Sequence, residues 1–295
     1  MPLRDSLLAV LVAVIWGVNF VVIDAGLAGM PPLLFVALRF VVVLVPALFL
    51  VPRPQARWQD VAVVGLLMSA AQFGLLYTSL YVGMPAGLAS LVVQAQVLLT
   101  VLIARGVLGE HPNRNQVAGV ALGALGLAVV AVGRSSATPL LGLVLALAAA
   151  LAWASGNVAS RRLGVASGLS MTVWSGTVVP LPLLALSLLL DGPRQVAHAL
   201  THLPASAIWS TAYTAYLASL VGYTIWNTLL ARHAAAAVVP FTLLVPPVGM
   251  ISAWLVQGEV PNGPETLGGV LLLAGVAASA LRPGALWRRE PGTAR

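Results

Sequence analysis

The sequence contains no cysteine and no lysine, and it has few charged residues of any kind. Without cysteine there is neither a disulfide nor a thiolate metal site. Charged residues make up 8% of the 295 residues and hydrophobic residues 60%, whereas a soluble globular protein has about 25% charged residues. A water-soluble core could not bury this much apolar surface, so we expect most of the chain to lie in lipid.

The sequence also has few of the residue groups that form active sites or nucleic-acid-binding surfaces. The net charge is +7, but the arginines lie between apolar runs and not on one face, so we expect no nucleic-acid partner. His198 and His202 are four residues apart without an evident third ligand, so we expect no metal. No Ser/His/Asp group and no carboxylate pair fall at a common depth. We therefore expect neither enzymatic activity nor a cofactor.

Ten apolar segments are long enough to cross a membrane, which takes about 20 residues. No alternation typical of strands persists, so the sequence predicts an all-α integral membrane protein with ten transmembrane helices. The first segment is longer than the core of a signal peptide and is expected to remain as a helix. The predicted spans are Ser6–Leu27, Pro32–Val51, Asp60–Val82, Pro85–Val107, Asn115–Gly133, Pro139–Ser160, Leu169–Leu190, Ala205–Ala231, Ala235–Gln257 and Glu265–Leu281.

A five-residue motif occurs twice, at Gly109–Asn113 and again 149 residues later at Gly258–Asn262. Both copies read Gly-Glu-x-Pro-Asn and stand between two apolar segments. Further pairs echo one another in the two halves: Gly119 with Gly268, Gly126 with Gly275, Trp16 and Asn19 with Trp153 and Asn157, and Pro46 with Pro180. We therefore divide the chain into a first repeat, residues 1–134, and a second repeat with a short tail, residues 135–295.

The arginines predict the orientation, because cytoplasmic loops are rich in basic residues. With the N-terminus in the cytoplasm, twelve arginines fall on the cytoplasmic side and only Arg134 and Arg194 on the outside. Ten spans then return the C-terminus to the cytoplasm. Five helices per half is an odd number, so the halves enter the membrane in opposite senses and form an inverted repeat.

Aromatic and amide side chains inside the apolar segments are the candidates for a binding site. In the eighth span Trp209, Tyr213, Tyr216, Leu220, Tyr223 and Asn227 follow helical spacing and predict one stripe, as Phe73, Tyr77 and Tyr81 do in the third. The alternatives are an aromatic belt at the membrane surface or ordinary helix packing. The predicted substrate-binding residues are Trp16, Asn19, Tyr77, Tyr81, Gln94, Trp153, Asn157, Tyr213, Tyr216, Tyr223 and Asn227.

Two charged residues and several prolines lie within the spans. We interpret Asp24 and Arg39 as a structural ion pair between the first two helices, with direct substrate contact by Arg39 as the alternative. Pro46, Pro180, Pro246 and Pro247 predict kinks that act in gating, or else static bends. A mixed aromatic and amide cavity suits a substrate with an apolar body and a polar, zwitterionic head.

The Trp16-Gly17-x-Asn19 run, the Pro32…Arg39-Phe40 run and the two Gly-Glu-x-Pro-Asn motifs resemble the EamA-type drug/metabolite transporter superfamily. Within it the chain is most similar to bacterial amino-acid exporters, particularly the aromatic amino-acid exporters of the YddG type. The resemblance implies a basket-like bundle whose central cavity is lined by helices 1, 3, 4, 6, 8 and 9, and export by alternating access.

The sequence thus favours a secondary transporter of the bacterial inner membrane that exports amino acids or similar small metabolites and acts as a monomer. Transport of another metabolite or drug in the same superfamily is the alternative, and a nucleotide-sugar substrate would need several cavity cations where only Arg39 is present. A membrane protein that transports nothing is the third possibility. Because Asp24 is the one candidate for a coupling carboxylate, we expect facilitated or weakly coupled movement.

Overall fold

The computed structural model describes residues 1–135, 138–163 and 168–280, and these are helical without any strand. Nine helical segments of the described chain are long and apolar enough to cross a membrane. The eighth predicted span is a continuous helical run but does not meet this criterion. The tail with Trp287 and four of the arginines predicted to be cytoplasmic lies outside the described residues.

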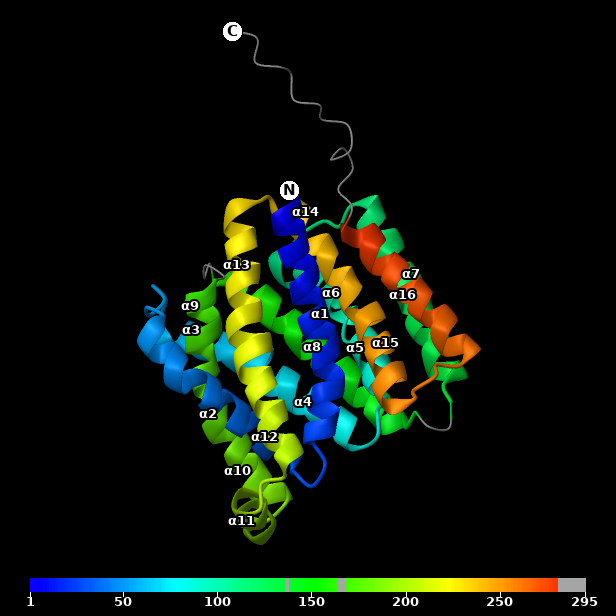
Figure 1. Cartoon of the computed structure of the whole chain (residues 1–295). Coiled ribbons are helices and arrows are strands. Elements are labelled where there is room, and N and C mark those ends of the chain that lie inside the picture. The colour runs from blue at the N-terminus through cyan, green and yellow to red at the C-terminus, as the bar shows by residue number, and fades with distance from the viewer. Residues whose placement is uncertain (136–137, 164–167, 281–295) are drawn as a thin grey trace.

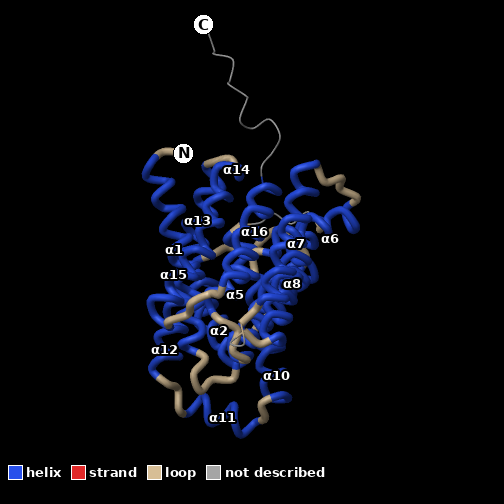
Figure 2. The backbone as a smooth tube through the Cα atoms, turned by 90° about the vertical axis from the view of Figure 1, so that its right-hand side faces the viewer, coloured by secondary structure: helices blue, strands red, loops and turns tan. Residues whose placement is uncertain are grey.

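The elements follow the predicted spans closely, with one addition. They are α1 Leu3–Gly26, α2 Pro32–Leu50, α3 Trp58–Gly65, η1 Leu66–Ala71, α4 Gln72–Tyr81, α5 Ala86–Val92, α6 Ala95–Leu108, α7 Arg114–Gly133, α8 Leu140–Arg162, α9 Leu169–Ser175, η2 Gly176–Val178, α10 Pro180–Leu190, α11 Pro193–Thr201, α12 Ala205–Ala212, η3 Tyr213–Val221, α13 Gly222–Arg232, α14 Ala235–Val238, η4 Val239–Leu244, α15 Val245–Gln257 and α16 Gly263–Ala280. The short helix α11 was not predicted and lies at the end of the bundle opposite the N-terminus (Figures 1 and 2).

Both Gly-Glu-x-Pro-Asn motifs form the same junction between two helices. Gly109 and Gly258 end their helices with left-handed φ angles of 68° and 70°, a conformation that glycine adopts without steric penalty. Asn113 then caps α7 and Asn262 caps α16, each through a reciprocal pair of hydrogen bonds with the residue three positions on. The sequence therefore specifies a helix end, a turn and a helix start in five residues.

Helices α7 and α16 lie side by side (Figure 1) and approach each other closely through glycines. A Cβ atom on Gly119 would lie 2.5 Å from the carbonyl oxygen of Gly275, and one on Gly126 would lie 2.6 Å from that of Gly268. Any side chain at these positions would collide with the opposite backbone. The glycines of α7 thus form a packing surface, as faces of small residues commonly do in membranes.

Several spans depart from regular α-helix near their middle. The third and eighth spans contain the π-helical segments η1 and η3, and such segments occur often at functional sites. The seventh span is interrupted at η2 before Pro180, and the ninth at η4 before Pro246. Pro46 lies inside α2 without interrupting it. Three of the four predicted proline sites, Pro180, Pro246 and Pro247, therefore coincide with helix breaks.

Candidate functional site

A cavity of about 820 Å³ lies inside the bundle and extends toward the end that carries the N-terminus. It reaches from the buried Arg39 to the exposed Ala234 and Pro240, near the start of α14. Its polar and aromatic lining residues are Arg39, Phe40, Ser69, Gln72, Phe73, Gln96, Thr100, Gln116, Trp153, Asn157, Ser160, Arg161, Thr172, Ser175, Ser219, Tyr223 and Ser279. Because apolar side chains fill the rest of the wall, the cavity suits a small amphipathic molecule.

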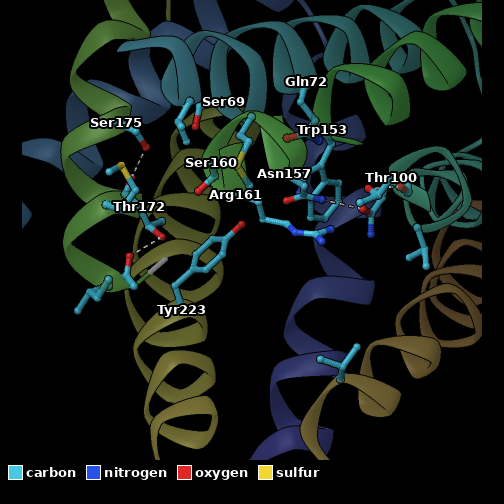
Figure 3. A pocket seen from close by; sticks show the side chains of 18 of the residues that line it. Ser69, Gln72, Thr100, Trp153, Asn157, Ser160, Arg161, Thr172, Ser175 and Tyr223 are labelled. Carbon is cyan, nitrogen blue, oxygen red and sulfur yellow. Dashed lines mark hydrogen bonds between the residues drawn. The ribbon is translucent and has the colours of Figure 1, made fainter. Parts of the chain in front are cut away.

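One wall of the cavity comes from α6 and α8, which pack against each other. The Asn157 side chain donates a hydrogen bond from Nδ2 to Oε1 of Gln96 at 3.1 Å. Trp153 lies one helical turn before Asn157, and both project into the cavity (Figure 3). This wall therefore presents an aromatic ring beside a pair of amides, which can donate and accept hydrogen bonds without carrying a charge.

The opposite side is formed by α9 and α13. Figure 3 shows Tyr223 projecting from α13 toward the space beside Asn157, with Thr172 and Ser175 on α9 nearby. The structure thus brings Trp153, Asn157 and Tyr223, three of the predicted binding residues, around one cavity. They come from the sixth and eighth spans, which are far apart in the sequence.

The predicted aromatic stripe of the eighth span is wrong, and η3 is the reason. The stripe assumed 3.6 residues per turn, but η3 is π-helical and has wider turns, which rotates later residues relative to earlier ones. Tyr216 is 44% exposed on the outside of the bundle, and the Tyr213 hydroxyl donates to the carbonyl oxygen of Ile15 at 2.9 Å. Of the six residues of the stripe, only Leu220 and Tyr223 line the cavity, and Tyr223, beyond the π segment, is the one aromatic residue among them.

The two tyrosines of the third span also differ in position. Tyr77 is fully buried, and its hydroxyl accepts a hydrogen bond from Nη1 of Arg39 at 3.2 Å. It therefore holds a lining residue in place without lining the cavity itself. Tyr81 ends α4 and is 51% exposed, since it lies beyond the part of the helix that neighbouring helices cover. Neither residue lines the cavity; Phe73, one turn before Tyr77, does.

Four other predicted binding residues instead connect helices or lie off the cavity. The Trp16 indole donates to the carbonyl oxygen of Ala218 at 3.0 Å, and Gln94 donates to that of Thr242 at 3.2 Å. Asn227 donates to the carbonyl oxygen of Tyr223 within its own helix. Asn19 is 8% exposed and is not among the lining residues. Trp16 and Gln94 thus connect neighbouring segments through hydrogen bonds, as polar side chains in membrane helices commonly do.

The predicted ion pair between Asp24 and Arg39 does not form. Asp24 accepts a hydrogen bond from Gln257 at 2.5 Å, whereas Arg39 donates to Tyr77 and, at 3.1 Å, to Oγ of Ser219. The two residues lie on opposite sides of their loop, fifteen positions apart on antiparallel helices, so Arg39 is set deeper in the membrane than Asp24. Arg39 lines the cavity, and the alternative of direct substrate contact stays a prediction.

Ser69 and Thr100 also line the cavity and were missed, although their spacing from other lining residues gives a signal. Ser69, Gln72 and Phe73 recur at three and four residues, and Gln96 and Thr100 are four apart, so each set shares a helix face. Contrary to the lining implied by the family resemblance, no described residue of the first helix lines the cavity, whereas α2 and α9 contribute. The spacing of polar residues along each helix identifies these faces without the family resemblance.

The charge of the cavity is positive in the part of the chain that the structure describes. Its charged lining residues are Arg39 and Arg161, and Arg161 forms an ion pair with Glu110 at the open end. No lining residue is acidic, and no cluster of metal-binding side chains occurs among the described residues. Such a lining favours substrates with a negative group and disfavours cations.

We therefore expect the cavity to discriminate against cationic molecules. Bringing a cation to Arg39 is opposed by like charge and is not compensated by any acidic residue among the described lining. Competition in reconstituted vesicles should show at least a tenfold weaker effect of lysine or arginine than of methionine or phenylalanine. Equal competition by lysine and methionine would contradict this description of the cavity.

Comparisons with known proteins agree with this architecture. The EamA-like transporter family matches residues 4–132 and again residues 140–281. A protein of Escherichia coli (strain K12) named "Probable amino-acid metabolite efflux pump" is 40% identical over 98% of both chains. A "Probable terminal-alkyne amino-acid exporter" of Streptantibioticus cattleyicolor is 35% identical over 77% of this chain and 74% of its own.

A solved crystal structure has a similar fold, with a TM-score of 0.62 over 94% of this chain and 96% of the other. Its sequence identity is 21%, so the likeness concerns the fold alone. The two family matches together cover nearly the whole chain, and the resemblance seen in the sequence is confirmed. The chain is a multi-pass membrane protein that belongs to the EamA-like transporter family.

Proposed function

We propose that this protein exports amino acids or similar small metabolites across the bacterial inner membrane through its central cavity. The observation that carries the proposal is the lining itself, in which Trp153 and Tyr223 offer aromatic surfaces beside the Asn157 amide and the Arg39 guanidinium. This set matches a molecule with an apolar side chain and a zwitterionic head. The names of the relatives, an efflux pump and an amino-acid exporter, support the same substrate class.

We further propose that the two halves are inverted repeats of five helices, with Ala205–Arg232 crossing the membrane as the eighth. Gly119 packs against Gly275, and Gly126 packs against Gly268. Gly268 is the repeat counterpart of Gly119, and Gly275 is that of Gly126. Exchanging the two halves therefore turns one contact into the other. A two-fold axis between α7 and α16 produces such reciprocal contacts. The π segments support the axis as well, since η1 and η3 occupy matching positions in the third and eighth spans.

Transport proceeds by alternating access, and the structure corresponds to the state open to the cytoplasm. This orientation rests on the arginine bias, which assigns the end with the N-terminus to the cytoplasm. The opposite end is held by contacts among α1, α5, α12 and α15. Substrate enters from the cytoplasm, binds between α8 and α13, and leaves when the halves rock about the breaks at Pro180 and Pro246, with Pro46 inside α2 bending that helix. A single chain is proposed as the transporting unit.

Transport is not coupled to protons through the cavity. Coupled transporters place carboxylates near the binding site, but no described lining residue is acidic and Asp24 is hydrogen-bonded to Gln257 instead. Counterflow of labelled methionine should therefore change less than twofold when a pH gradient of one unit is imposed. Acceleration of tenfold or more would require a titrating group in the transport cycle and would refute uncoupled movement.

Trp153→Ala tests the site directly. Removing the indole deletes the largest aromatic surface on the α8 wall, so a bound substrate would stack and bury its apolar part less well. Transport should fall at least tenfold, measured as uptake of labelled phenylalanine or methionine into proteoliposomes. Trp209→Ala is the matched control, because Trp209 is 75% exposed on the outside of the bundle and should leave transport unchanged. Equal effects of the two substitutions would place the site elsewhere.

A further inference from the structure

Arg39 is a buried cation without a counter-ion in the described chain. It is 3% exposed, and no carboxylate lies within ion-pair distance of it among the described residues. A guanidinium has five N–H donors, and burying its charge without an anion is unfavourable. The residue thus remains available for a negatively charged group from outside the protein.

The neighbours of Arg39 fix its orientation without neutralising it. Nη1 donates to the Tyr77 hydroxyl at 3.2 Å and Nη2 to Ser219 at 3.1 Å, while the guanidinium carbon lies 4.2 Å from the centre of the Phe73 ring. These partners are a phenol, an alcohol and an aromatic face, all uncharged. The Nε atom is buried and has no hydrogen-bond partner in the protein. Arg39 therefore has an unused N–H donor at Nε, and the same residue lines the cavity.

We propose that Arg39 binds the carboxylate of the transported substrate and selects for it. This inference rests on the proposed function and adds the group by which the site recognises its substrate. A carboxylate accepts two parallel hydrogen bonds from a guanidinium, one from Nε and one from an Nη atom, which gives both strength and orientation. The substrate side chain then extends along the wall of Trp153 and Tyr223, and the amides of Gln96 and Asn157 lie within the same cavity.

The test compares amino acids with their primary amides, which lack the carboxylate. In proteoliposomes the protein should transport phenylalanine about 10 to 100 times better than phenylalaninamide, as expected for a charge-assisted hydrogen bond. Arg39→Gln should bring this ratio to within about threefold of one while the amide is still transported. Ser175→Ala, at another lining residue, should leave the ratio unchanged.

Three results would overturn the assignment. Arg39→Gln that keeps the acid-to-amide ratio, or that lowers both substrates equally, would give Arg39 a structural role only. Where Arg39→Gln does not fold, Arg39→Lys decides: it keeps the charge but not the two parallel donors, and a ratio equal to that of the unmodified protein contradicts the proposal. Failure of the unmodified protein to transport any amino acid would instead reject the proposed function.

A second inference comes from the glutamates of the repeated motif, which have different partners at the two ends of the bundle. The Glu259 carboxylate accepts hydrogen bonds from the backbone N–H groups of Ala86 and Gly87, at 2.8 and 2.9 Å. These groups start α5, so Glu259 ties the end of α15 to the start of the fourth span. At the other end Glu110, its repeat counterpart, forms an exposed ion pair with Arg161.

The repeat predicts a second kind of partner for Glu110, namely the backbone N–H groups at the start of a helix, as Glu259 has. The 149-residue shift that relates Glu110 to Glu259 also relates Ala86 and Gly87 to Ala235 and Ala236, which start α14. Charge-assisted bonds from a carboxylate to the first N–H groups of a helix are stabilising at either end. We infer that the two glutamates alternate: Glu259 caps α5 while the cavity is open to the cytoplasm, and Glu110 caps α14 when it is open outward.

Single-cysteine labelling tests this alternation in a chain that has no cysteine of its own. Ser90 is 1% exposed between α5 and α15, and Ser160 lines the open cavity. In Glu259→Gln, modification of Ser90→Cys by a membrane-impermeant thiol reagent should rise several-fold and that of Ser160→Cys should fall. Glu110→Gln should not raise labelling of Ser90→Cys. Labelling that rises at both sites indicates unfolding and no change at either indicates no gating role; both results contradict the inference.

Discussion

Gly126→Leu is expected to prevent α7 from packing against α16 and to abolish accumulation of folded protein. A Cβ atom at Gly126 would lie 2.6 Å from both the carbonyl oxygen of Gly268 and the backbone nitrogen of Leu272. Backbone atoms cannot rotate away as a side chain can, so the two helices would have to separate. Overpacking of a side chain costs about 1–3 kcal/mol, and a collision with backbone exceeds that range.

Gly106→Leu is the matched control for this substitution. Gly106 lies in α6, and a Cβ atom there would meet nothing within 4 Å beyond the adjacent backbone of its own helix. Leucine also favours a helix over glycine by up to about 1 kcal/mol, so the control should fold as well as the unmodified protein. Size-exclusion chromatography of the protein in detergent after heating measures both variants. A Gly126→Leu protein as heat-resistant as Gly106→Leu would show that the α7–α16 contact does not hold the halves together.

Tyr77→Ala is expected to lower the stability of the protein much more than Tyr81→Ala, although the two tyrosines lie one turn apart on α4. Tyr77 is fully buried and its ring packs edge-on against Phe35 and Phe73, with centroids 5.5 and 6.4 Å apart. Alanine would leave a hole of roughly 100 Å³, which costs about 2 kcal/mol. Tyr81 is 51% exposed, so its loss removes little packing.

Tyr77 also has a role in transport that its packing alone does not explain. Tyr77 fixes one Nη atom of Arg39, so Tyr77→Phe should keep the packing yet weaken substrate binding several-fold. Thermal unfolding in detergent and the concentration dependence of transport measure the two effects separately. Equal unfolding temperatures for Tyr77→Ala and Tyr81→Ala would contradict the position assigned to Tyr77.

The positions of the spans could be predicted from the sequence because lipid imposes a simple length requirement. The first predicted span, Ser6–Leu27, differs from α1 by only a few residues. The close glycine contact of α7 also followed from spacing, since small residues four and three apart leave room for a second helix. The helix α11 was missed because its nine residues carry charge and histidine and read as a loop.

The candidate site could be predicted only in part because helical wheels assume a regular helix. The π segment η3 separates Tyr223 from Tyr216, and no residue pattern in the eighth span signals that change of winding. The partner of Arg39 was missed for a different reason. Sequence positions estimate depth in the membrane but not which helices face each other across the bundle, and Ser219 lies 180 residues away.

Blocking the cavity in a reconstituted transporter tests the central claim most directly. Thr100→Cys introduces one thiol into the lining, and Thr201→Cys introduces one on the exposed helix α11. Counterflow of labelled methionine or phenylalanine into proteoliposomes is measured before and after a bulky membrane-permeant maleimide. We predict transport by both variants before modification, and its loss in Thr100→Cys alone afterwards. Full transport by modified Thr100→Cys, or no transport of any amino acid by the unmodified protein, would contradict export through this cavity.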